Sequence, residues 1–486
     1  MKISLLVIAA TAVSAGIHAQ TPIFGHRTYA GQYTYNHADL NNDGREDLMY
    51  HTQTGFAVVL SNGPGSYAAP VEYNVPNNYG SETVALDINN DGKLDVIAFN
   101  SGANDFYEYL NTGNGALKLE KSYPMAEIQD MVVGDFNHDG YADIAFITFD
   151  QNLHVWFNNH DGGFTVGPTT ALPIPTGNTQ MTIGDFDGDG AADLAVTSTQ
   201  STYLFFGDNT GHFTAVNATT THHPQAYLMD IDGDGKSDLV GAGVAGSDGM
   251  YDLYYRDLWV VYGNLSRTVT ESDIPLNGYV APWSWGPYQD KTPSVDVADL
   301  NGDGKRDLTL VEAQNNNGTG TQTLVVKLGN GDRTWGNEEN VYSSSELESG
   351  VAVLRATEAL KPDLLVGTYL NGTQTGQFFL NDTSGGYFGG CPFPDTATGI
   401  DVCSPNTYTS TSAKFDASAA GQTWMRKMEV WVDGVKKYQQ LADHDYSHYA
   451  NLDTTLTLSA GTHQVTVIAA GYDNLELKKT YTITVK

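Results

Sequence analysis

The sequence predicts an all-β fold, with a seven-bladed β-propeller at residues 20–390 and a small β-sandwich at residues 391–486. The first part repeats one aspartate-rich unit, and self-similarity at a regular period indicates a repeat architecture. Each unit contains four short apolar segments divided by turn residues, as expected for one blade. The last part lacks this unit and alternates apolar with polar residues, which predicts strands with one buried face.

The repeated unit is marked by a nine-residue loop that occurs six times. The copies are DLNNDGRED from residue 39, DINNDGKLD from 87, DFNHDGYAD from 135, DFDGDGAAD from 185, DIDGDGKSD from 230 and DLNGDGKRD from 299. Successive copies are 48, 48, 50, 45 and 69 residues apart. An apolar segment comes before and after each loop, so we expect every loop to join the first two strands of a blade.

A seventh unit, at residues 351–388, lacks the loop. It keeps Asp363, which aligns with the last aspartate of the other copies. The positions of the first three acidic residues are taken by Arg355, Thr357 and Ala359. We therefore expect no metal in this blade. Residues 22–31 resemble a fourth strand, and their pairing with the last blade would close the ring and remove its exposed edges.

The loop offers the oxygen ligands that calcium prefers. Positions 1, 3, 5 and 9 are Asp or Asn in every copy, and position 6 is always glycine, as expected at a tight turn. Position 7 varies, which suits a ligand that is a backbone carbonyl. We expect about six calcium ions, one for each loop. The predicted ligands are Asp39, Asn41, Asp43, Arg45 and Asp47; Asp87, Asn89, Asp91, Lys93 and Asp95; Asp135, Asn137, Asp139, Tyr141 and Asp143; Asp185, Asp187, Asp189, Ala191 and Asp193; Asp230, Asp232, Asp234, Lys236 and Asp238; Asp299, Asn301, Asp303, Lys305 and Asp307.

EF-hands and metal-free turns are the two alternatives to such calcium loops. An EF-hand needs a Glu at position 12 and flanking helices, but position 12 here is Tyr, Ala, Phe, Val, Gly or Leu. Asx-rich turns without metal are the other alternative. Three or four carboxylates in one turn repel one another unless a cation neutralises them, which favours metal. His138, at position 4 of the third loop, is expected to be unconstrained and to face solvent.

These loops resemble the FG-GAP or VCBS repeats of integrin α-subunit propellers and of many secreted bacterial proteins. The resemblance covers about residues 22–390. It implies a seven-bladed propeller, calcium in the hairpin between the first two strands of a blade, and a role in adhesion or ligand binding. The seventh unit departs from the family pattern because it has no ligand set.

The segment from about residue 396 reads as alternating strands and resembles the immunoglobulin-like modules appended to secreted bacterial proteins. The Asp433-Gly434 pair predicts a tight hairpin between two of these strands. Cys391 and Cys403 are the two cysteines of the chain, and an even count in an exported protein favours one local disulfide. Two unpaired thiols are the alternative. No functional site is assigned to this domain.

Charge and the N-terminus limit the partners and the location. Asp and Glu outnumber Lys and Arg by 57 to 24, giving a net charge of −33, which argues against nucleic acid and anionic membranes as partners. Residues 1–19 read as an export signal, with Lys2 before an apolar stretch too short to span a membrane. We therefore expect a secreted or extracytoplasmic monomer with no membrane span.

The sequence leaves the ligand open. The long step after Asp230 contains Trp283, Trp285 and Tyr288 among Pro and Gly, and such loop aromatics can stack on sugar rings. They can also fold back and cover a seam between blades, an interpretation slightly favoured because large aromatics are more often buried than exposed. No common catalytic motif occurs. The leading hypothesis is a binding or adhesion protein for a glycan or protein. The alternative is a carbohydrate-active enzyme, such as a polysaccharide lyase, with its site in the propeller funnel. A purely structural component of a surface assembly is a third possibility.

Overall fold

The computed structural model describes residues 26–31, 36–63, 66–76, 82–99, 105–125, 127–173, 179–198, 201–218, 226–242, 255–280, 295–314, 321–354, 362–370, 373–381, 399–421, 425–441, 449–471 and 476–486. Every regular element in these residues is a β-strand, so the predicted all-β class is confirmed. Accordingly, none of the described residues forms a helix of the length and hydrophobicity that crossing a membrane requires.

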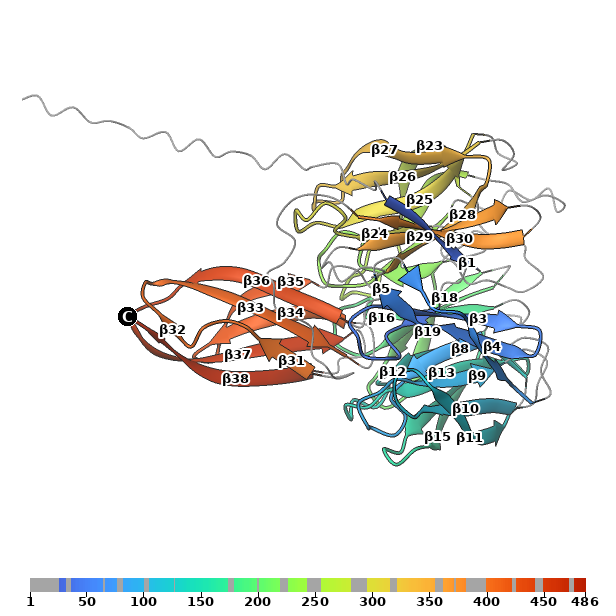
Figure 1. The fold of residues 1–486 in the computed structure, drawn as a ribbon, viewed down its shortest axis with the longest axis horizontal. Coiled ribbons are helices and arrows are strands. Elements are labelled where there is room, and N and C mark those ends of the chain that lie inside the picture. Colours follow the sequence, from blue (N-terminus) through green and yellow to red (C-terminus); the bar gives the residue numbers. More distant parts are fainter. Residues whose placement is uncertain are drawn as a thin grey trace, which may run out of the picture.

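Up to Leu380, the described strands form five antiparallel sheets of four strands, one sheet of eight strands and one small hairpin. The eight-stranded sheet divides into two groups of four, and we number the resulting seven groups as sheets 1 to 7 (Figure 1). Sheet 1 is β2 (His37–Ala38), β3 (Asp47–Thr52), β4 (Gly55–Val59) and β7 (Val71–Asn74). Sheet 2 is β8 (Glu82–Leu86), β9 (Asp95–Phe99), β10 (Asp105–Asn111) and β11 (Leu117–Pro124). Sheet 3 is β12 (Ile128–Gly134), β13 (Asp143–Thr148), β14 (Asn152–Asn158) and β15 (Phe164–Ala171). A small hairpin, β5 (Ser61–Gly63) with β6 (Ser66–Tyr67), lies within the sheet 1 segment.

The later sheets follow the same order of strands. Sheet 4 is β16 (Gln180–Gly184), β17 (Asp193–Thr197), β18 (Thr202–Gly207) and β19 (Phe213–Asn217). Sheet 5 is β20 (Tyr227–Met229), β21 (Asp238–Ala242), β22 (Tyr255–Val261) and β23 (Glu271–Val280). Sheet 6 is β24 (Val295–Ala298), β25 (Asp307–Ala313), β26 (Gln322–Gly329) and β27 (Trp335–Ser344). A single pairing between Tyr279 and Ala313 links sheets 5 and 6.

Sheet 7 combines the two ends of the repeat region. It contains β28 (Leu347–Leu354), β29 (Asp363–Leu370), β30 (Thr373–Leu380) and the N-terminal β1 (His26–Gly31). Strand β1 runs antiparallel to β30, with His26 opposite Leu380, so the expected pairing of the N-terminal segment with the last unit is confirmed. One apolar cluster joins sheet 7 to sheet 1, because Leu48 and Val59 pack with Leu354 and Phe378.

Burial explains why the second strand of each unit is so apolar. All residues of β9, β13, β17 and β21 are buried, since both faces of these strands are covered. The fourth strands are largely exposed, as β11, β15 and β19 show. The core therefore lies between neighbouring sheets, and the loops that precede the second strands are held by a rigid interior.

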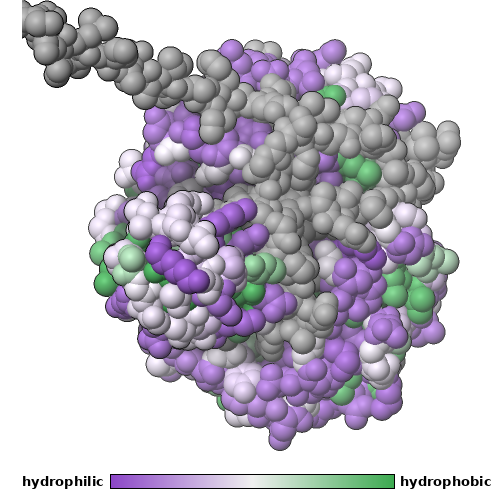
Figure 2. All heavy atoms as spheres, turned by 60° about the vertical axis from the view of Figure 1, so that its left-hand side comes forward, coloured by the Kyte–Doolittle hydropathy of each residue, from purple (hydrophilic) through white to green (hydrophobic). Residues whose placement is uncertain are grey.

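The C-terminal domain is a two-sheet structure that lies to one side of the repeats (Figure 1). One sheet is β31 (Gly399–Val402), β33 (Ser412–Ala420) and β36 (Tyr449–Thr457). The other is β32 (Thr407–Tyr408), β38 (Glu476–Val485), β37 (Gly461–Gly471), β34 (Met425–Val432) and β35 (Val435–Leu441). Both contribute to one core, which includes Phe415, Leu452, Val430 and Val467. Figure 2, which brings this side forward, shows a mainly hydrophilic surface with small hydrophobic areas.

Two local predictions for this domain can be compared with the structure. Asp433 and Gly434 both have positive φ, 52° and 77°, and form the two-residue turn between β34 and β35. That geometry is the one that an Asp-Gly hairpin favours. Cys403 is disulfide-bonded, while its predicted partner Cys391 lies outside the described residues.

Candidate metal centre

Each of the six nine-residue loops joins the first and second strands of its sheet. The fourth, loop 4 (residues 185–193), connects β16 to β17, and loop 5 (residues 230–238) connects β20 to β21. The other four occupy the same place in sheets 1, 2, 3 and 6. The sequence-predicted ligands of each loop are therefore gathered at one edge of the sheet, where the chain turns back.

Two positions of every loop adopt positive φ. At position 6 the glycines have φ between 81° and 93°, as predicted. Position 4 is also left-handed, in Asn42, Asn90, His138, Gly188, Gly233 and Gly302. The expectation that His138 is unconstrained is thus wrong for its backbone, which has φ of 59°, although its side chain is exposed. Asn and Gly tolerate this conformation best, and their recurrence at position 4 was a signal that the sequence contained.

The last aspartate of each loop joins the loop to the second and third strands. In loop 4, Asp193 Oδ2 accepts a hydrogen bond from the Phe186 amide at 3.0 Å and Oδ1 accepts one from the Gly207 amide at 2.9 Å. In loop 5, Asp238 accepts corresponding bonds from Ile231 and Gly263 at 3.0 and 2.8 Å. The carboxylate thereby ties the loop to the end of the third strand.

Asp363 shows that this anchor does not depend on the rest of the loop. Sheet 7 lacks the other acidic positions, yet Asp363 Oδ1 still accepts a hydrogen bond from the Asn381 amide at 2.8 Å. Asn381 also donates through Nδ2 to the carbonyls of Leu300 and Pro362, at 2.9 and 3.1 Å. The position-9 aspartate therefore has a structural role in a unit where no ligand set exists.

The residue that ends the third strand was missed in the sequence. In sheets 2, 3 and 7 it is an asparagine whose amide bridges its own loop to the preceding sheet, as Asn111 does with the carbonyls of Leu94 and Leu40. In sheets 4, 5 and 6 it is a glycine, since a Cβ there would lie 1.9 to 2.5 Å from a backbone oxygen. In every unit except the first, the third apolar segment ends with Asn or Gly, and this recurrence was visible in the sequence.

The other acidic positions of the loops fold the turn. At position 3, Oδ1 accepts a hydrogen bond from the amide of position 5. For example, Asp187 Oδ1 accepts one from the Asp189 amide at 3.0 Å. At position 5, Oδ1 accepts a hydrogen bond from the amide of position 7. For example, Asp234 Oδ1 accepts one from the Lys236 amide at 2.9 Å. These are Asx-type turns. Each carboxylate oxygen has a second lone pair, so the same turns leave oxygens available to a cation.

Loops 4 and 5 bring three carboxylates together. Oxygens of Asp185, Asp187 and Asp193 lie within 4.8 Å of one another, and so do those of Asp230, Asp232 and Asp238. Five of these six residues are buried. The hard oxygen donors and their convergence fit a calcium ion in these two loops. These loops differ from the other four because position 3 is Asp and not Asn.

Burial makes the ionised form of these carboxylates costly. It raises the pKa of Asp193 to about 8, and the nearby charges of Asp187 and Asp185 add to the shift against the lowering effect of the backbone hydrogen bonds. Asp238 is shifted in the same direction, well above its ordinary value, by burial and by Asp232 and Asp230. A cation in the loop would compensate these charges.

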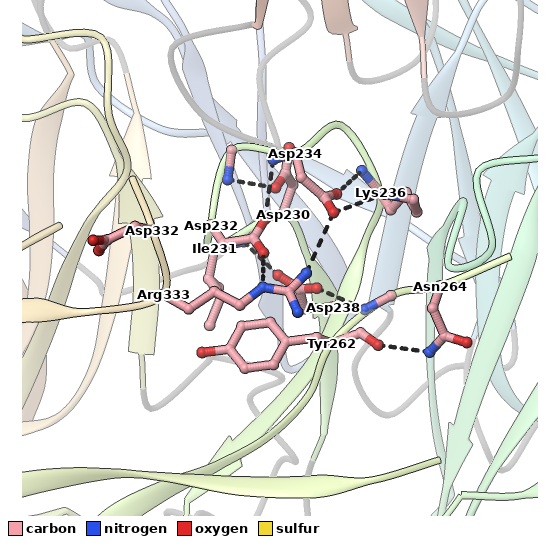
Figure 3. A network of polar contacts seen from close by, with 12 residues as sticks. Asp230, Ile231, Asp232, Asp234, Lys236, Asp238, Tyr262, Asn264, Asp332 and Arg333 are labelled. Atoms are coloured by element: carbon pink, nitrogen blue, oxygen red, sulfur yellow. Dashed lines mark hydrogen bonds and ion pairs between the residues drawn. The ribbon is translucent and has the colours of Figure 1, made fainter. Parts of the chain in front are cut away.

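Arginines from the following sheet already contact both loops. Arg333, in the turn between β26 and β27, donates from Nε to Asp232 Oδ2 at 2.6 Å and from Nη2 to Asp234 Oδ2 at 3.4 Å (Figure 3). Its guanidinium lies 4.2 Å from the centre of the Tyr262 ring. Arg267, in the turn after β22, makes the equivalent contacts to Asp187 and Asp189 at 2.6 and 3.2 Å.

Position 7 also contributes a charge in several loops. Side chains there pair with the position-5 aspartate, as Lys236 Nζ does with Asp234 Oδ2 at 2.7 Å. Arg45 and Lys93 make the same contact in loops 1 and 2, both at 2.6 Å. The variable residue at position 7 predicted only a carbonyl ligand, so the charges of these side chains were missed in the sequence.

A hollow of about 440 Å³ lies beside loop 5. It is lined by Tyr262, Ser272, Asp273, Ile274, Pro275, Lys327, Arg333 and Trp335. Arg333 belongs both to this wall and to the loop contacts, so the hollow and loop 5 share a side chain. The aromatic residues that the sequence singled out, Trp283, Trp285 and Tyr288, lie outside the described residues.

Comparison with known families gives one match. The FG-GAP-like repeat matches residues 87–146, 135–196 and 185–241. These segments contain loops 2 to 5 with the strands around them. No curated protein matches the chain.

Solved structures resemble the chain only distantly. A structure of an Agrocybe aegerita lectin, described as recognising non-reducing terminal N-acetylglucosamine, is 20% identical over 64% of this chain and 81% of that one, with a TM-score of 0.43. BBS1N in complex with ARL6DN is 10% identical over 75% and 98%, with a TM-score of 0.49. Chaetomium thermophilum Raptor is 7% identical over 76% and 29%, with a TM-score of 0.44. None of these likenesses is close enough to support a conclusion about ligands. Residues 87–241 therefore match the FG-GAP-like repeat, within a chain whose described regular elements are all β-strands.

Proposed function

We propose that this protein is an exported β-propeller of seven blades, with about six structural calcium ions and an immunoglobulin-like C-terminal domain, that binds an extracellular glycan or protein. The observation that carries the calcium part is the convergence of three carboxylates in each of loops 4 and 5, most of them buried. Buried like charges are costly unless a counter-charge is present. The FG-GAP-like match over residues 87–241 supports the propeller part.

Calcium would act on the fold and not on a reaction. When bound, it supplies positive charge to the loop carboxylates. Asp193 and Asp238 already join the loop to two strands, so a cation there would brace the same junction. Because an ion bound only by the folded state stabilises that state, calcium is expected to raise the melting temperature.

The hollow beside loop 5 is a candidate site for a sugar. Tyr262 and Trp335 offer half-buried aromatic rings, and Ser272, Asp273 and Lys327 offer hydrogen-bonding groups. Sugars bind through stacking on aromatic faces combined with a few placed polar groups. The protein would then act as a monomeric binding or adhesion module outside the cytoplasm.

A glycan array with the full chain tests the ligand class. We expect binding to at least one glycan, a loss of more than tenfold in affinity for Trp335→Ala, and little change for the control Trp431→Ala in β34 of the C-terminal domain. Binding that survives Trp335→Ala moves the site away from the hollow. If no glycan binds, the glycan part is wrong. Release of new reducing ends or unsaturated products from a polysaccharide would instead favour the enzyme alternative.

A further inference from the structure

Loop 4 carries a contact that the other loops lack in the described part of the chain. Arg426, in β34 of the C-terminal domain, donates through Nη1 to Asp185 Oδ2, the first position of the loop. The two residues are 241 positions apart in sequence. Asp185 is fully buried and Arg426 is only 8% exposed, so the ion pair is shielded from water and counter-ions.

The backbone of both partners sets up this contact. Asp185 is held by Ser237 of sheet 5, which accepts its amide through Oγ at 3.1 Å and donates an amide to its carbonyl at 2.9 Å. On the other side, the register of β34 against β37 shifts between Met425 and Lys427. Such an irregularity redirects a side chain out of the sheet, and here it directs Arg426 to the propeller.

Arg426 replaces contacts that close the other loops. In loop 5, Asp230 Oδ1 and Oδ2 accept the amides of Gly233 and Gly235 at 2.8 and 3.0 Å. In loop 4, Asp185 Oδ1 is buried and makes no hydrogen bond of normal geometry among the described residues, although the Gly188 amide still interacts with the carboxylate. Arg426 Nε is also buried without a hydrogen-bond partner among these residues. A buried carboxylate oxygen without a partner is costly, so the site has capacity for another donor or for a cation.

We propose that loop 4 is the attachment point of the C-terminal domain, and that the Arg426 guanidinium and a divalent cation exclude each other there. A cation that binds Asp185, Asp187 and Asp193 would lie beside the guanidinium in a buried site, where like charges repel strongly. Cation binding to loop 4 therefore releases the C-terminal domain, and docking of the domain keeps the cation out. The docking itself does not rest on the proposed calcium function; the exclusion does.

The test measures the distance between the two domains in the full chain. Spin labels are placed at Val166→Cys in β15 and Val435→Cys in β35, which are 67% and 54% exposed. In EDTA we expect a narrow distance distribution for the parent chain. Arg426→Gln and Asp185→Asn should both broaden it, and since they alter opposite sides of the contact, misfolding of one domain cannot explain both. Arg333→Gln, which removes the corresponding arginine contact at loop 5, is the matched control and should leave it narrow.

Two outcomes overturn the proposal. If Arg426→Gln and Asp185→Asn give the same narrow distribution as the parent chain in EDTA, Arg426 does not hold the domain. If millimolar calcium chloride leaves the parent distribution narrow, the cation and the guanidinium do not compete. The first outcome says nothing against glycan binding, which the array measures separately, so failure of the attachment and failure of the proposed function can be told apart.

Discussion

Loops 4 and 5 have nearly the same sequence but different partners. Both have aspartate at positions 1, 3, 5 and 9, and both receive an arginine from the next sheet, Arg267 or Arg333. The first aspartate has different partners: Asp230 accepts two amides of its own loop, whereas Asp185 contacts Arg426 of the C-terminal domain. Position 7 also differs, because Lys236 pairs with Asp234 in loop 5 and loop 4 has Ala191 there. The nine-residue motif therefore specifies the turn, while the tertiary setting decides which cation its carboxylates meet.

In the loops with aspartate at position 3, the additional negative charge is accompanied by a nearby positive charge. Loops 4 and 5 have this extra carboxylate, and each is followed by an arginine in the next sheet's turn. Where position 3 is asparagine, as in loops 1 to 3, the corresponding described turns contain no arginine. The two arginines therefore offset the added negative charge.

The largest expected effect is that of removing the position-9 aspartate, which both loops have. Asp193→Ala and Asp238→Ala each leave two buried backbone amides without an acceptor, so both should lower the free energy of unfolding by about 2 kcal/mol or more. Urea unfolding in EDTA measures this. A clearly smaller loss for one of the two would mean that the anchor is not common to both loops.

Asp363→Ala extends that test to sheet 7, where the loop is missing. It should also destabilise the protein, and calcium should not change the size of the loss. A calcium-dependent loss would show that sheet 7 binds metal after all.

Calcium binding to loop 5 should stabilise the protein more than calcium binding to loop 4. One site with calcium at a hundred times its dissociation constant adds about 2.7 kcal/mol of stability. Asp230→Asn should therefore reduce the rise in melting temperature that calcium produces. Asp185→Asn should reduce it less, because Arg426 competes with the ion at that loop. Calorimetry in EDTA and in calcium gives both values; equal reductions would contradict the difference between the loops.

The metal-free protein should lose stability as pH rises. The pKa of Asp193 is raised from its ordinary value of 3.8 to about 8, so the folded state holds the proton more tightly than the unfolded state does. The stabilisation that Asp193 contributes is fully present below about pH 4 and is lost as the pH rises through about 8. Calcium binds the ionised form and should remove this loss. Melting curves across that range, with calcium and with EDTA, check the sign; a rise with pH in EDTA would contradict it.

The smallest effect is expected for the arginines that the loops share. Arg267 and Arg333 are 39% and 45% exposed in their side chains, and exposed ion pairs contribute about 0 to 1 kcal/mol. Arg267→Gln and Arg333→Gln should thus lower stability slightly, by similar amounts, and less so in high salt. A large loss for either one would mean that it carries more of the link between sheets than its exposure suggests.

Much of the repeat region could be predicted from the sequence because its information is local. The loops, their glycines and the strands around them lie within each unit of the chain, and the closing strand was visible in residues 22–31. The left-handed position 4 was also readable, since it holds Asn, His or Gly in every copy. The aspartate and arginine pairs of loops 4 and 5 could have been found by comparing one unit with the next.

The contact of Arg426 could not be predicted. Its partner is in another domain, and the side chain is aimed by a register shift that only the paired strands reveal. The dual role of Asp193 and its equivalents was equally hidden, because the amide at the end of the third strand is defined by the fold and not by the motif. The ligand surface depends on segments that do not repeat, so periodicity gives no information about it.

Equilibrium dialysis of the full chain against calcium measures directly whether the loops are metal sites. We expect saturation at one ion for each of the six loops, with the loop 4 ion bound more weakly than the others and strengthened by Arg426→Gln. A chain that retains no calcium above the buffer concentration would contradict it, and the loops would then be Asx turns whose charges are met by arginine and lysine alone.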